Sequence, residues 1–484
     1  RLRSRTPTLP LPIFFLTDKP SSCITLSTVV VPHWNRLRSL KHLTIQTAGS
    51  DFVLYFPHLR AVNYKLPAFR DVCTYFATIM GLRNIIFIQC VVIILCAGRV
   101  HNKKRNINTN AINEFRDPSS MIQLDSYQLI RKFGYASERH SVTTEDNYVL
   151  DLFRIPSNGV PVLLVHGIAD SSDGWVVLGP QLSMAYQLAD AGFDVWMYNA
   201  RGNKYSKKHR RNIPKEKYWD FSYEEMGTKD LPATIDYILN KTSHTQLLYV
   251  GFSQGTTIFL VMCSMRPDYN DKIAQAVLLA PVAWVTRLEY PLIQVLTQNL
   301  REISVLFDTV GLRELFPSRA IQNLYHAYVC NEQSPARVLC ALEYYFSFGV
   351  RNINNFPNDK LPVVASHISA GTSKKTFEHF IQGVSSKGFL RFDHDREVNQ
   401  MLYGNVNPPA YNLSLVSVPV TLFCSESDQF STIYDVQTLR SKLPNVKNFV
   451  MLKKELDFTH LEFVYGRRVK TLINDPVVRL FSGN

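Results

Sequence analysis

The pentapeptide Gly-Phe-Ser-Gln-Gly at residues 251–255 constrains the fold of this chain more than any other feature. It follows the apolar run Gln246–Val250 and precedes a helix-like stretch, Thr256–Met262. A serine on a sharp strand-to-helix turn needs glycines on both sides, because a Cβ there would collide with the strained turn and its neighbours. Such a turn exposes the Oγ of Ser253 and points the backbone N–H of Gln254 at a developing oxyanion. The pentapeptide predicts a nucleophile elbow, although five-residue patterns also occur by chance, so its context must support it.

Short apolar runs alternate with helical patterns along much of the chain. This alternation predicts an α/β fold, in which a mostly parallel central sheet is flanked by helices on both faces. We expect strands at six runs, namely Val160–Val165, Asp194–Asn199, Gln246–Val250, Ala276–Ala280, Val418–Cys424 and Asn448–Leu452.

The interval between the fourth and fifth of these strands lacks the alternation. It carries helical periodicity instead, with apolar residues at Leu292, Val295, Leu296, Leu300 and Ile303. We therefore expect an inserted helical cap and lid at residues 290–408. The two parts of the sheet domain would then be residues 115–289 and 409–484.

The chain begins with arginine, and its first methionine is Met80. Arg83 provides a positive start and Ile85–Ala97 contains no charged residue, a pattern typical of a signal peptide. We interpret residues 80–98 as a signal peptide and residues 1–79 as a non-native or disordered N-terminal extension. The uncharged run is too short to span a bilayer comfortably, so no transmembrane segment is expected in the mature protein. A buried strand or a short membrane anchor is the alternative.

The net charge of +13 is unevenly distributed. Residues 1–79 hold ten Lys or Arg and three Asp, so they contribute +7 and leave +6 for residues 80–484. A net charge of +6 is small for about 400 residues, and we expect no nucleic-acid partner. The strongest basic run, Lys204–Arg211, is interpreted as a solvated loop, with an anionic lipid surface as the alternative.

Four cysteines follow the predicted signal peptide, and secretion would expose them to an oxidising compartment. Cys330 and Cys340 would close a short loop and are the disulfide candidates. Cys263 and Cys424 lie in helical and strand patterns, where buried free thiols are expected. Two glycosylation sequons agree with secretion, Asn240-Lys241-Thr242 and Asn412-Leu413-Ser414. No Cys/His spacing typical of a metal site occurs, and we expect neither metal nor cofactor.

A serine nucleophile needs a base within hydrogen-bond reach and an acid that holds this base in the correct tautomer. In hydrolases with such an elbow the chain order is Ser, then Asp or Glu, then His. His460 is the only histidine beyond the last predicted strands. It is the predicted base, and a purely structural histidine is the alternative.

Asp428 is the predicted acid, because it lies just beyond the strand Val418–Cys424 and sheets of this kind carry their sites at the carboxyl ends of strands. Glu426 and Asp435 compete for this role. Asp457 is nearer to the base along the chain, but such proximity usually indicates a turn carboxylate.

A second oxyanion donor is expected where an early strand leads into a loop. His166-Gly167 follows the apolar run Val162–Val165, and the N–H of Ile168 would face Ser253 beside that of Gln254. A plain loop turn explains the His-Gly pair equally well. Its position directly after a strand and before the elbow favours the oxyanion interpretation.

Longer motifs resemble the acid lipase family, the relatives of gastric and lysosomal acid lipases within the α/β-hydrolase fold. The resemblance covers roughly residues 120–470. It rests on Gly134–Glu138, Thr143–Tyr148, His166–Ser172, Leu188–Trp196, Asn199–Asn203, Trp219–Ser222, Glu225–Gly227, Asp230–Ala233, Tyr411–Ser414 and Lys442–Asn445.

The resemblance implies particular roles for residues of this chain. It implies Ser253 as nucleophile, Asp428 as acid and His460 as base, with Ile168 and Gln254 as oxyanion donors. It further implies that the cap and lid screen a hydrophobic acyl pocket. The short disulfide of the family is similar to a Cys330–Cys340 pair.

This chain departs from the family pattern at three positions. Phe252 stands where the family usually has His, Val165 stands where it has Gln, and Thr459 stands before the base where Asn or Glu is common. The changes at Phe252 and Val165 remove no expected catalytic atom, because the oxyanion hole is built from backbone N–H groups. Both could reshape the pocket or its response to pH.

The expected function is hydrolysis of fatty-acid esters, triacylglycerols or sterol esters, by a secreted or lysosomal lipase that meets its substrate at an oil–water or membrane interface. A lipid-binding or storage protein on a hydrolase scaffold is the alternative from another class, because fold does not determine function. A thioesterase or an esterase for small esters is the alternative within the same chemistry.

Overall fold

The computed structural model describes residues 11–13, 27–29, 43–47, 50–54, 121–288 and 291–483, and the chain divides into two units. In the first unit, Arg1–Ile107, the described strands form two antiparallel pairs, β1 (Leu11–Ile13) with β2 (Ser27–Val29) and β3 (Leu43–Thr47) with β4 (Ser50–Leu54). The signal peptide predicted at residues 80–98 lies outside the described residues. Its assignment and that of residues 1–79 stay predictions.

A central sheet organises the second unit, Asn108–Asn484. Its described strands are β5 (Glu138–Thr143), β6 (Tyr148–Ile155), β7 (Pro161–Val165), β8 (Asp194–Met197), β9 (Lys208–His209), β10 (Leu247–Phe252), β11 (Ile273–Leu279), β14 (Val420–Ser425) and β15 (Val446–Leu452). Their spatial order is β15-β14-β11-β10-β7-β8-β6-β5, and β9 pairs with β6. Neighbours from β15 to β8 are parallel, whereas β6 is antiparallel to β5, β8 and β9. The expected mostly parallel sheet is confirmed.

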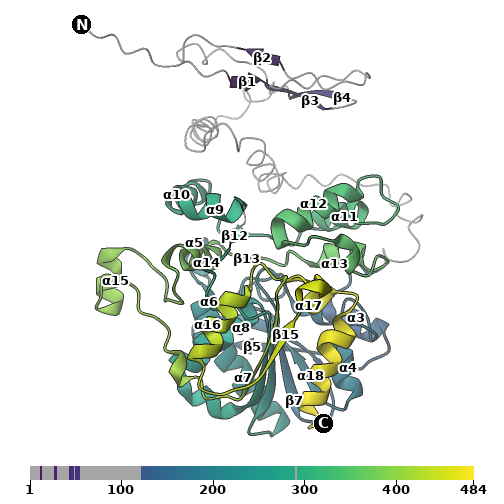
Figure 1. Cartoon of the computed structure of the whole chain (residues 1–484). Helices are drawn as coiled ribbons and strands as arrows, with labels where there is room; N and C mark the ends of the chain where they lie inside the picture. Colours follow the sequence, from purple (N-terminus) through teal and green to yellow (C-terminus); the bar gives the residue numbers. More distant parts are fainter. Residues whose placement is uncertain are drawn as a thin grey trace. The chain divides into compact units, whose positions relative to one another are not determined.

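The inner parallel strands β7 and β10 are apolar and buried along their whole length, because both faces of the sheet are covered there. In β7, Val162 and Leu164 join one hydrophobic core and Leu163 and Val165 join the other, as the two-residue period of a strand requires. The first core is covered by α3 (Ser126–Lys132), α4 (Met184–Asp190) and α18 (Asp475–Phe481), and the second by α7 (Leu231–Thr242), α8 (Gln254–Met265) and α16 (Ile433–Lys442) (Figure 1).

The interval expected to be the cap is helical in its described part. It contains α9 (Pro291–Gln298), α10 (Leu300–Thr309), α11 (Ala320–Val329), α12 (Arg337–Phe348), α13 (Leu361–His367), α14 (Lys374–Ser386), α15 (Arg396–Tyr403) and an antiparallel pair, β12 (Glu314–Leu315) with β13 (Thr372–Ser373). Figure 1 shows α9 to α14 gathered at one end of the sheet, with α15 to the side. Leu361 and Val364 of α13 share the first core with Val162 of the sheet. Part of this interval is therefore built into the sheet domain.

Short helical turns connect the larger elements. They are η5 (Ser172–Trp175), α5 (Lys215–Tyr218), α6 (Tyr223–Glu225), η6 (Met226–Asp230), η7 (Pro267–Lys272), η8 (Ile353–Asn355), η9 (Leu413–Leu415), η10 (Lys454–Leu456), α17 (Glu462–Tyr465) and η11 (Lys470–Asn474). Within the described ranges, no helix combines the length and apolar character needed to cross a bilayer.

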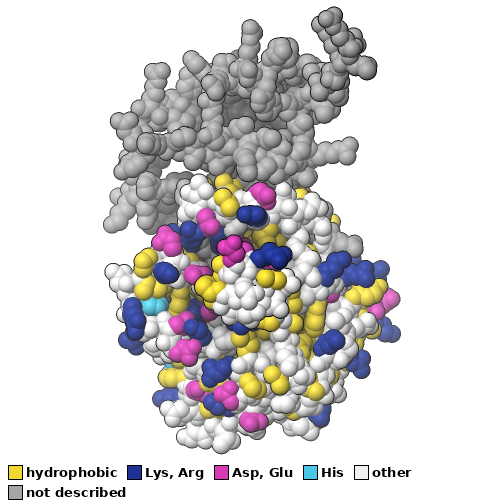
Figure 2. Space-filling model, turned by 90° about the vertical axis from the view of Figure 1, so that its left-hand side faces the viewer, with side chains coloured by type: hydrophobic (Ala, Val, Ile, Leu, Met, Phe, Trp, Pro, Cys, Tyr) yellow, Lys and Arg dark blue, Asp and Glu magenta, His cyan; other side chains and the backbone are white. Residues whose placement is uncertain are grey.

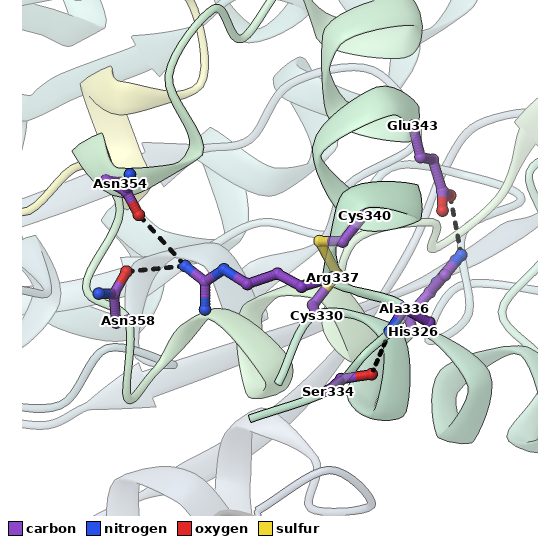
Figure 3. The surroundings of a disulfide bond; sticks show 9 residues. All are labelled: His326, Cys330, Ser334, Ala336, Arg337, Cys340, Glu343, Asn354 and Asn358. Atoms are coloured by element: carbon purple, nitrogen blue, oxygen red, sulfur yellow. Dashed lines mark hydrogen bonds and ion pairs between the residues drawn. A yellow bond between two sulfur atoms is a disulfide. The ribbon is translucent and has the colours of Figure 1, made fainter. Parts of the chain in front are cut away.

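A disulfide between Cys330 and Cys340 joins the end of α11 to α12 (Figure 3). Beside it, Nε2 of His326 lies 2.8 Å from a carboxylate oxygen of Glu343, which links the same two helices. Cys263 and Cys424 are buried free thiols.

Opposite charges are mixed on the surface that Figure 2 shows, where Lys and Arg side chains are interspersed with Asp and Glu side chains. Several described cations are in ion pairs, for example Arg391 with Glu224 at 2.6 Å. The positive net charge therefore does not gather into one patch on that face.

Candidate active site

Ser253 alone lies between the end of β10 and the start of α8. Its φ of 52° and ψ of −116° belong to a region that residues with a side chain rarely adopt. The flanking glycines are required by close packing. A Cβ on Gly251 would lie 2.8 Å from the backbone of Gly255, and a Cβ on Gly255 would lie 2.3 Å from the carbonyl oxygen of Val165. The local geometry is that of a nucleophile elbow.

The side chains of Ser253, His460 and Asp428 form a continuous hydrogen-bonded chain. Nε2 of His460 lies 2.8 Å from Oγ of Ser253, and Nδ1 of His460 lies 2.7 Å from Oδ2 of Asp428. The three residues follow β10, β15 and β14, so all of them lie at the carboxyl ends of parallel strands. Each is at most 7% exposed.

The second oxygen of Asp428 is fixed by the backbone. Oδ1 accepts hydrogen bonds from the N–H groups of Phe430 at 2.8 Å and Ser431 at 3.0 Å. This arrangement leaves Oδ2 to accept the Nδ1 proton of His460. Nε2 is then free of a proton and able to accept one from Ser253, which is the tautomer that a general base requires.

The competing carboxylates have other partners. Glu426 accepts a hydrogen bond from the N–H of Lys454 at 2.8 Å, and Asp457 lies 2.8 Å from a guanidinium nitrogen of Arg351. Asp435 accepts from Thr286. Of the four carboxylates considered, only Asp428 contacts the imidazole of His460.

The expected oxyanion residues lie on two segments that meet at Ser253. Gln254 is the first residue of α8, where backbone N–H groups have no partner inside the helix. Ile168 follows Gly167, on which a Cβ would lie 3.3 Å from the Cβ of Ser253. The loop that carries Ile168 therefore packs directly against the elbow.

His166, just before this loop, is a structural residue. Burial lowers the pKa of its imidazole to about 4, although a hydrogen bond to the carbonyl of Gly167 at 2.7 Å opposes the shift. Its Nε2 accepts from the N–H of Ala200 at 3.1 Å. The ring is therefore neutral and holds the turn in place.

Two aromatic rings pack against the imidazole of His460. The ring centroid of Phe252 lies 5.1 Å from it and that of Phe430 lies 5.3 Å from it. Phe252 is one of the three residues that depart from the family pattern. It gives His460 an apolar neighbour on the side of the elbow.

The sequence patterns did not single out Glu462, which supports the loop that carries His460. One oxygen of Glu462 accepts from the N–H of Thr459 at 2.7 Å and from its hydroxyl at 2.8 Å, so the carboxyl fixes the residue before His460. Burial raises the pKa of Glu462 to about 7. The only sequence signal is a carboxylate two positions beyond the predicted base.

Burial raises the pKa of Glu462 from 4.5 to about 7. We therefore expect the free energy of unfolding of Glu462→Gln, measured relative to that of the wild type, to increase as the pH rises from about 4.5 to about 7. Between these values the unfolded carboxyl has lost its proton and the folded one retains it, so folding of the wild type weakens as the pH increases. Glutamine does not titrate. The relative gain should be on the order of 3 kcal/mol, measured by urea unfolding of both proteins at pH 4.5 and 7.5.

The difference in free energy of unfolding between Glu462→Gln and the wild type isolates the contribution of Glu462. Burial lowers the pKa of His166 to about 4 and that of His379 to about 3, and these groups make the wild type more stable as the pH rises toward 6.5. Both histidines are present in both proteins, so their contributions cancel in the difference. Parallel stability curves would show that Glu462 does not bind a proton on folding.

Comparison with known proteins identifies the family. A family model described as the alpha/beta hydrolase fold matches residues 160–310, and one described as a partial alpha/beta-hydrolase lipase region matches residues 126–179. Lipase 1 of Drosophila melanogaster is 41% identical over 352 residues, which cover 72% of this chain and 77% of that protein.

Two human proteins are also similar. Lipase member K is 35% identical over 366 residues, which cover 73% of this chain and 90% of that protein. Gastric triacylglycerol lipase is 33% identical over 378 residues, which cover 75% of this chain and 92% of that protein. The chain therefore belongs to the acid lipase family of the α/β-hydrolase fold, together with gastric triacylglycerol lipase, and is a carboxylic ester hydrolase.

Proposed function

We propose that this enzyme is a lipase that hydrolyses fatty-acid esters, triacylglycerols or sterol esters, through a catalytic triad of Ser253, His460 and Asp428. The observation that carries the proposal is the hydrogen-bonded chain from Oγ of Ser253 through the imidazole to the carboxylate of Asp428. The similarity to gastric triacylglycerol lipase supports the choice of substrate.

The reaction proceeds in two halves. Nε2 of His460 accepts the proton of Ser253 while Oγ attacks the ester carbonyl, and Asp428 stabilises the resulting imidazolium. The N–H groups of Ile168 and Gln254 stabilise the tetrahedral oxyanion. His460 then protonates the departing alcohol to leave an acyl-enzyme. Water, activated by the same imidazole, releases the fatty acid.

The disulfide-linked helices α11 and α12 support a lipid surface as the partner. Each carries a row of exposed large apolar side chains at helical spacing, formed by Ile321, Leu324, Tyr325 and Tyr328 on α11 and by Val338, Leu339, Leu342, Tyr345 and Phe346 on α12. Apolar rows of this extent disfavour exposure to water and favour contact with lipid. An oil–water or membrane interface would cover them.

A secreted or lysosomal location agrees with several features. The Cys330–Cys340 disulfide is typical of oxidising compartments. Both sequon residues, Asn240 and Asn412, are exposed and so accessible to glycosylation.

A fluorophosphonate probe tests the proposed function on the wild-type chain. We expect covalent labelling at Ser253, located by peptide mass spectrometry, and hydrolysis of tributyrin, triolein and cholesteryl oleate assayed at acidic and neutral pH. Lipid binding without labelling would instead identify a lipid-binding protein on a hydrolase scaffold. Hydrolysis confined to tributyrin would identify an esterase for small esters.

A further inference from the structure

The loop that carries Ile168 is held by a segment of the helical interval that follows β11. Ala169, the next residue, has a φ of 54°, a left-handed conformation that is strained for a residue with a Cβ. Its carbonyl oxygen accepts a hydrogen bond from the N–H of Ala370 at 2.6 Å, and the carbonyl of Ala370 accepts from the N–H of Lys204 at 2.6 Å. Ala370 thus joins the loop to the turn that follows β8.

Ala370 lies three residues beyond His367, where α13 ends, and this histidine is the anchor of the segment. Its side chain is buried at 2% exposure, with Nδ1 2.5 Å from Oδ2 of Asp173 and Nε2 2.9 Å from the carbonyl oxygen of Met121. Both partners are acceptors. The buried ring of His367 therefore links the backbone at Met121 to the buried carboxylate of Asp173.

The carboxylate of Asp173 also accepts hydrogen bonds from residues far apart along the chain. It accepts from the hydroxyls of Ser126 at 2.5 Å and Tyr205 at 2.7 Å, and it contacts the ammonium of Lys204. Burial alone would raise the pKa of Asp173, but Lys204 and His367 lower it below its usual value. Lys204 opens the basic run expected to be solvated, and that expectation is wrong for this residue, which contacts a fully buried carboxylate.

Asp173 lies in η5, five residues beyond Ile168. Between them, Asp170 accepts hydrogen bonds from its neighbour's N–H at 2.7 Å and from the hydroxyl of Tyr465 at 2.8 Å. The loop is therefore fixed at its start against the elbow, at its centre by Tyr465 and Ala370, and at its end by the pair with His367. A strained residue persists only where its surroundings hold it in this way.

We propose that His367 is a positioning residue for the oxyanion donor Ile168. Its hydrogen bond with Asp173 fixes residues 367–371 against the loop, so that Ala370 holds Ala169 in its left-handed conformation and keeps the chain at Ile168 in place. A movement that displaces α13 would also disassemble the oxyanion hole. This inference rests on the proposed function of Ser253 and Ile168.

The test compares His367→Leu with His367→Asn on a soluble p-nitrophenyl ester. A displaced oxyanion donor weakens the transition state more than the bound substrate. We expect kcat to fall about 100-fold for His367→Leu and about tenfold for His367→Asn, which keeps a donor for Asp173, with KM unchanged within about twofold. The inhibition constant of a trifluoromethyl ketone, whose adduct with Ser253 carries an oxyanion, should rise by the same factors.

His326→Leu is the matched control. His326 is also buried in this helical interval, and its Nε2 lies 2.8 Å from Glu343, yet its partners lie on α11 and α12 and not on the oxyanion loop (Figure 3). We expect it to lower the melting temperature and leave kcat and the inhibition constant unchanged.

Retention of wild-type kcat and inhibition constant by His367→Asn would overturn the inference, even if His367→Leu does not fold. Equal falls in kcat for the His326 and His367 variants would also overturn it, because they would show a general effect of stability. Absence of fluorophosphonate labelling in the wild type would instead reject the proposed function itself.

Discussion

Replacing Ser253 by alanine is expected to lower kcat/KM for every ester substrate by about 10⁴-fold or more, because the variant has no oxygen to form the acyl-enzyme. The oxyanion donors and the substrate site remain, so a small residual activity by direct attack of water is compatible with the mechanism. The measurement is initial-rate hydrolysis of a p-nitrophenyl ester and of triolein, with fluorophosphonate labelling as the second readout.

Ser264→Ala is the appropriate control for this variant. Ser264 is a buried serine of α8, the helix that Ser253 precedes, but its hydroxyl donates to the carbonyl of Val261 at 3.0 Å and does not contact His460. We expect full activity and unchanged labelling. Activity of Ser253→Ala above about one tenth of the wild type would exclude Ser253 as the nucleophile.

The inner parallel strands of the sheet could be predicted from the sequence because they are buried on both faces. Strands such as β7 and β10 therefore appear as uninterrupted apolar runs. The antiparallel strands β5 and β6 escape this criterion. In β5 exposed and partly buried residues alternate, since one face meets solvent, and a short alternating segment resembles an ordinary loop.

Chain order reduced the search for the site to few residues. It predicted His460 as the base, and the position just beyond β14 favoured Asp428 as the acid, with Glu426 and Asp435 as competitors. The sequence does not show which of these carboxylates faces the imidazole. The distinguishing feature is the pair of backbone N–H groups, from Phe430 and Ser431, that turns Asp428 toward the imidazole.

The contacts that support the site could not be predicted. Tyr465 reaches Asp170 across 295 residues of sequence, and His367 reaches Asp173 across 194 residues. Sequence motifs describe residues that are close along the chain, so they cannot predict contacts between residues this far apart. Helical periodicity indicated the helices of residues 290–408, but it could not indicate that α13 joins the core of the sheet, since every residue of this short helix is buried and no polar face marks its orientation.

Asp428→Asn is expected to lower kcat by about 10⁴-fold while the fold and KM change little, through an effect on the tautomer of His460. The N–H groups of Phe430 and Ser431 require an acceptor, so the amide oxygen takes the position of Oδ1. The NH₂ group then faces Nδ1 of His460 and donates to it. The imidazole proton must move to Nε2, which can no longer accept the proton of Ser253.

Glu426→Gln separates this effect from a general loss of negative charge at the end of β14. Glu426 lies two residues away, but among the described residues it accepts from the backbone of Lys454 and does not contact His460. Its replacement should leave kcat within about twofold of the wild type, because exposed charges contribute little. Equal losses of kcat in the two variants would mean that His460 depends on the overall negative charge at the end of β14 rather than on one hydrogen bond. A loss confined to Asp428→Asn would mean that one hydrogen bond, by fixing the tautomer of His460, makes Ser253 a nucleophile.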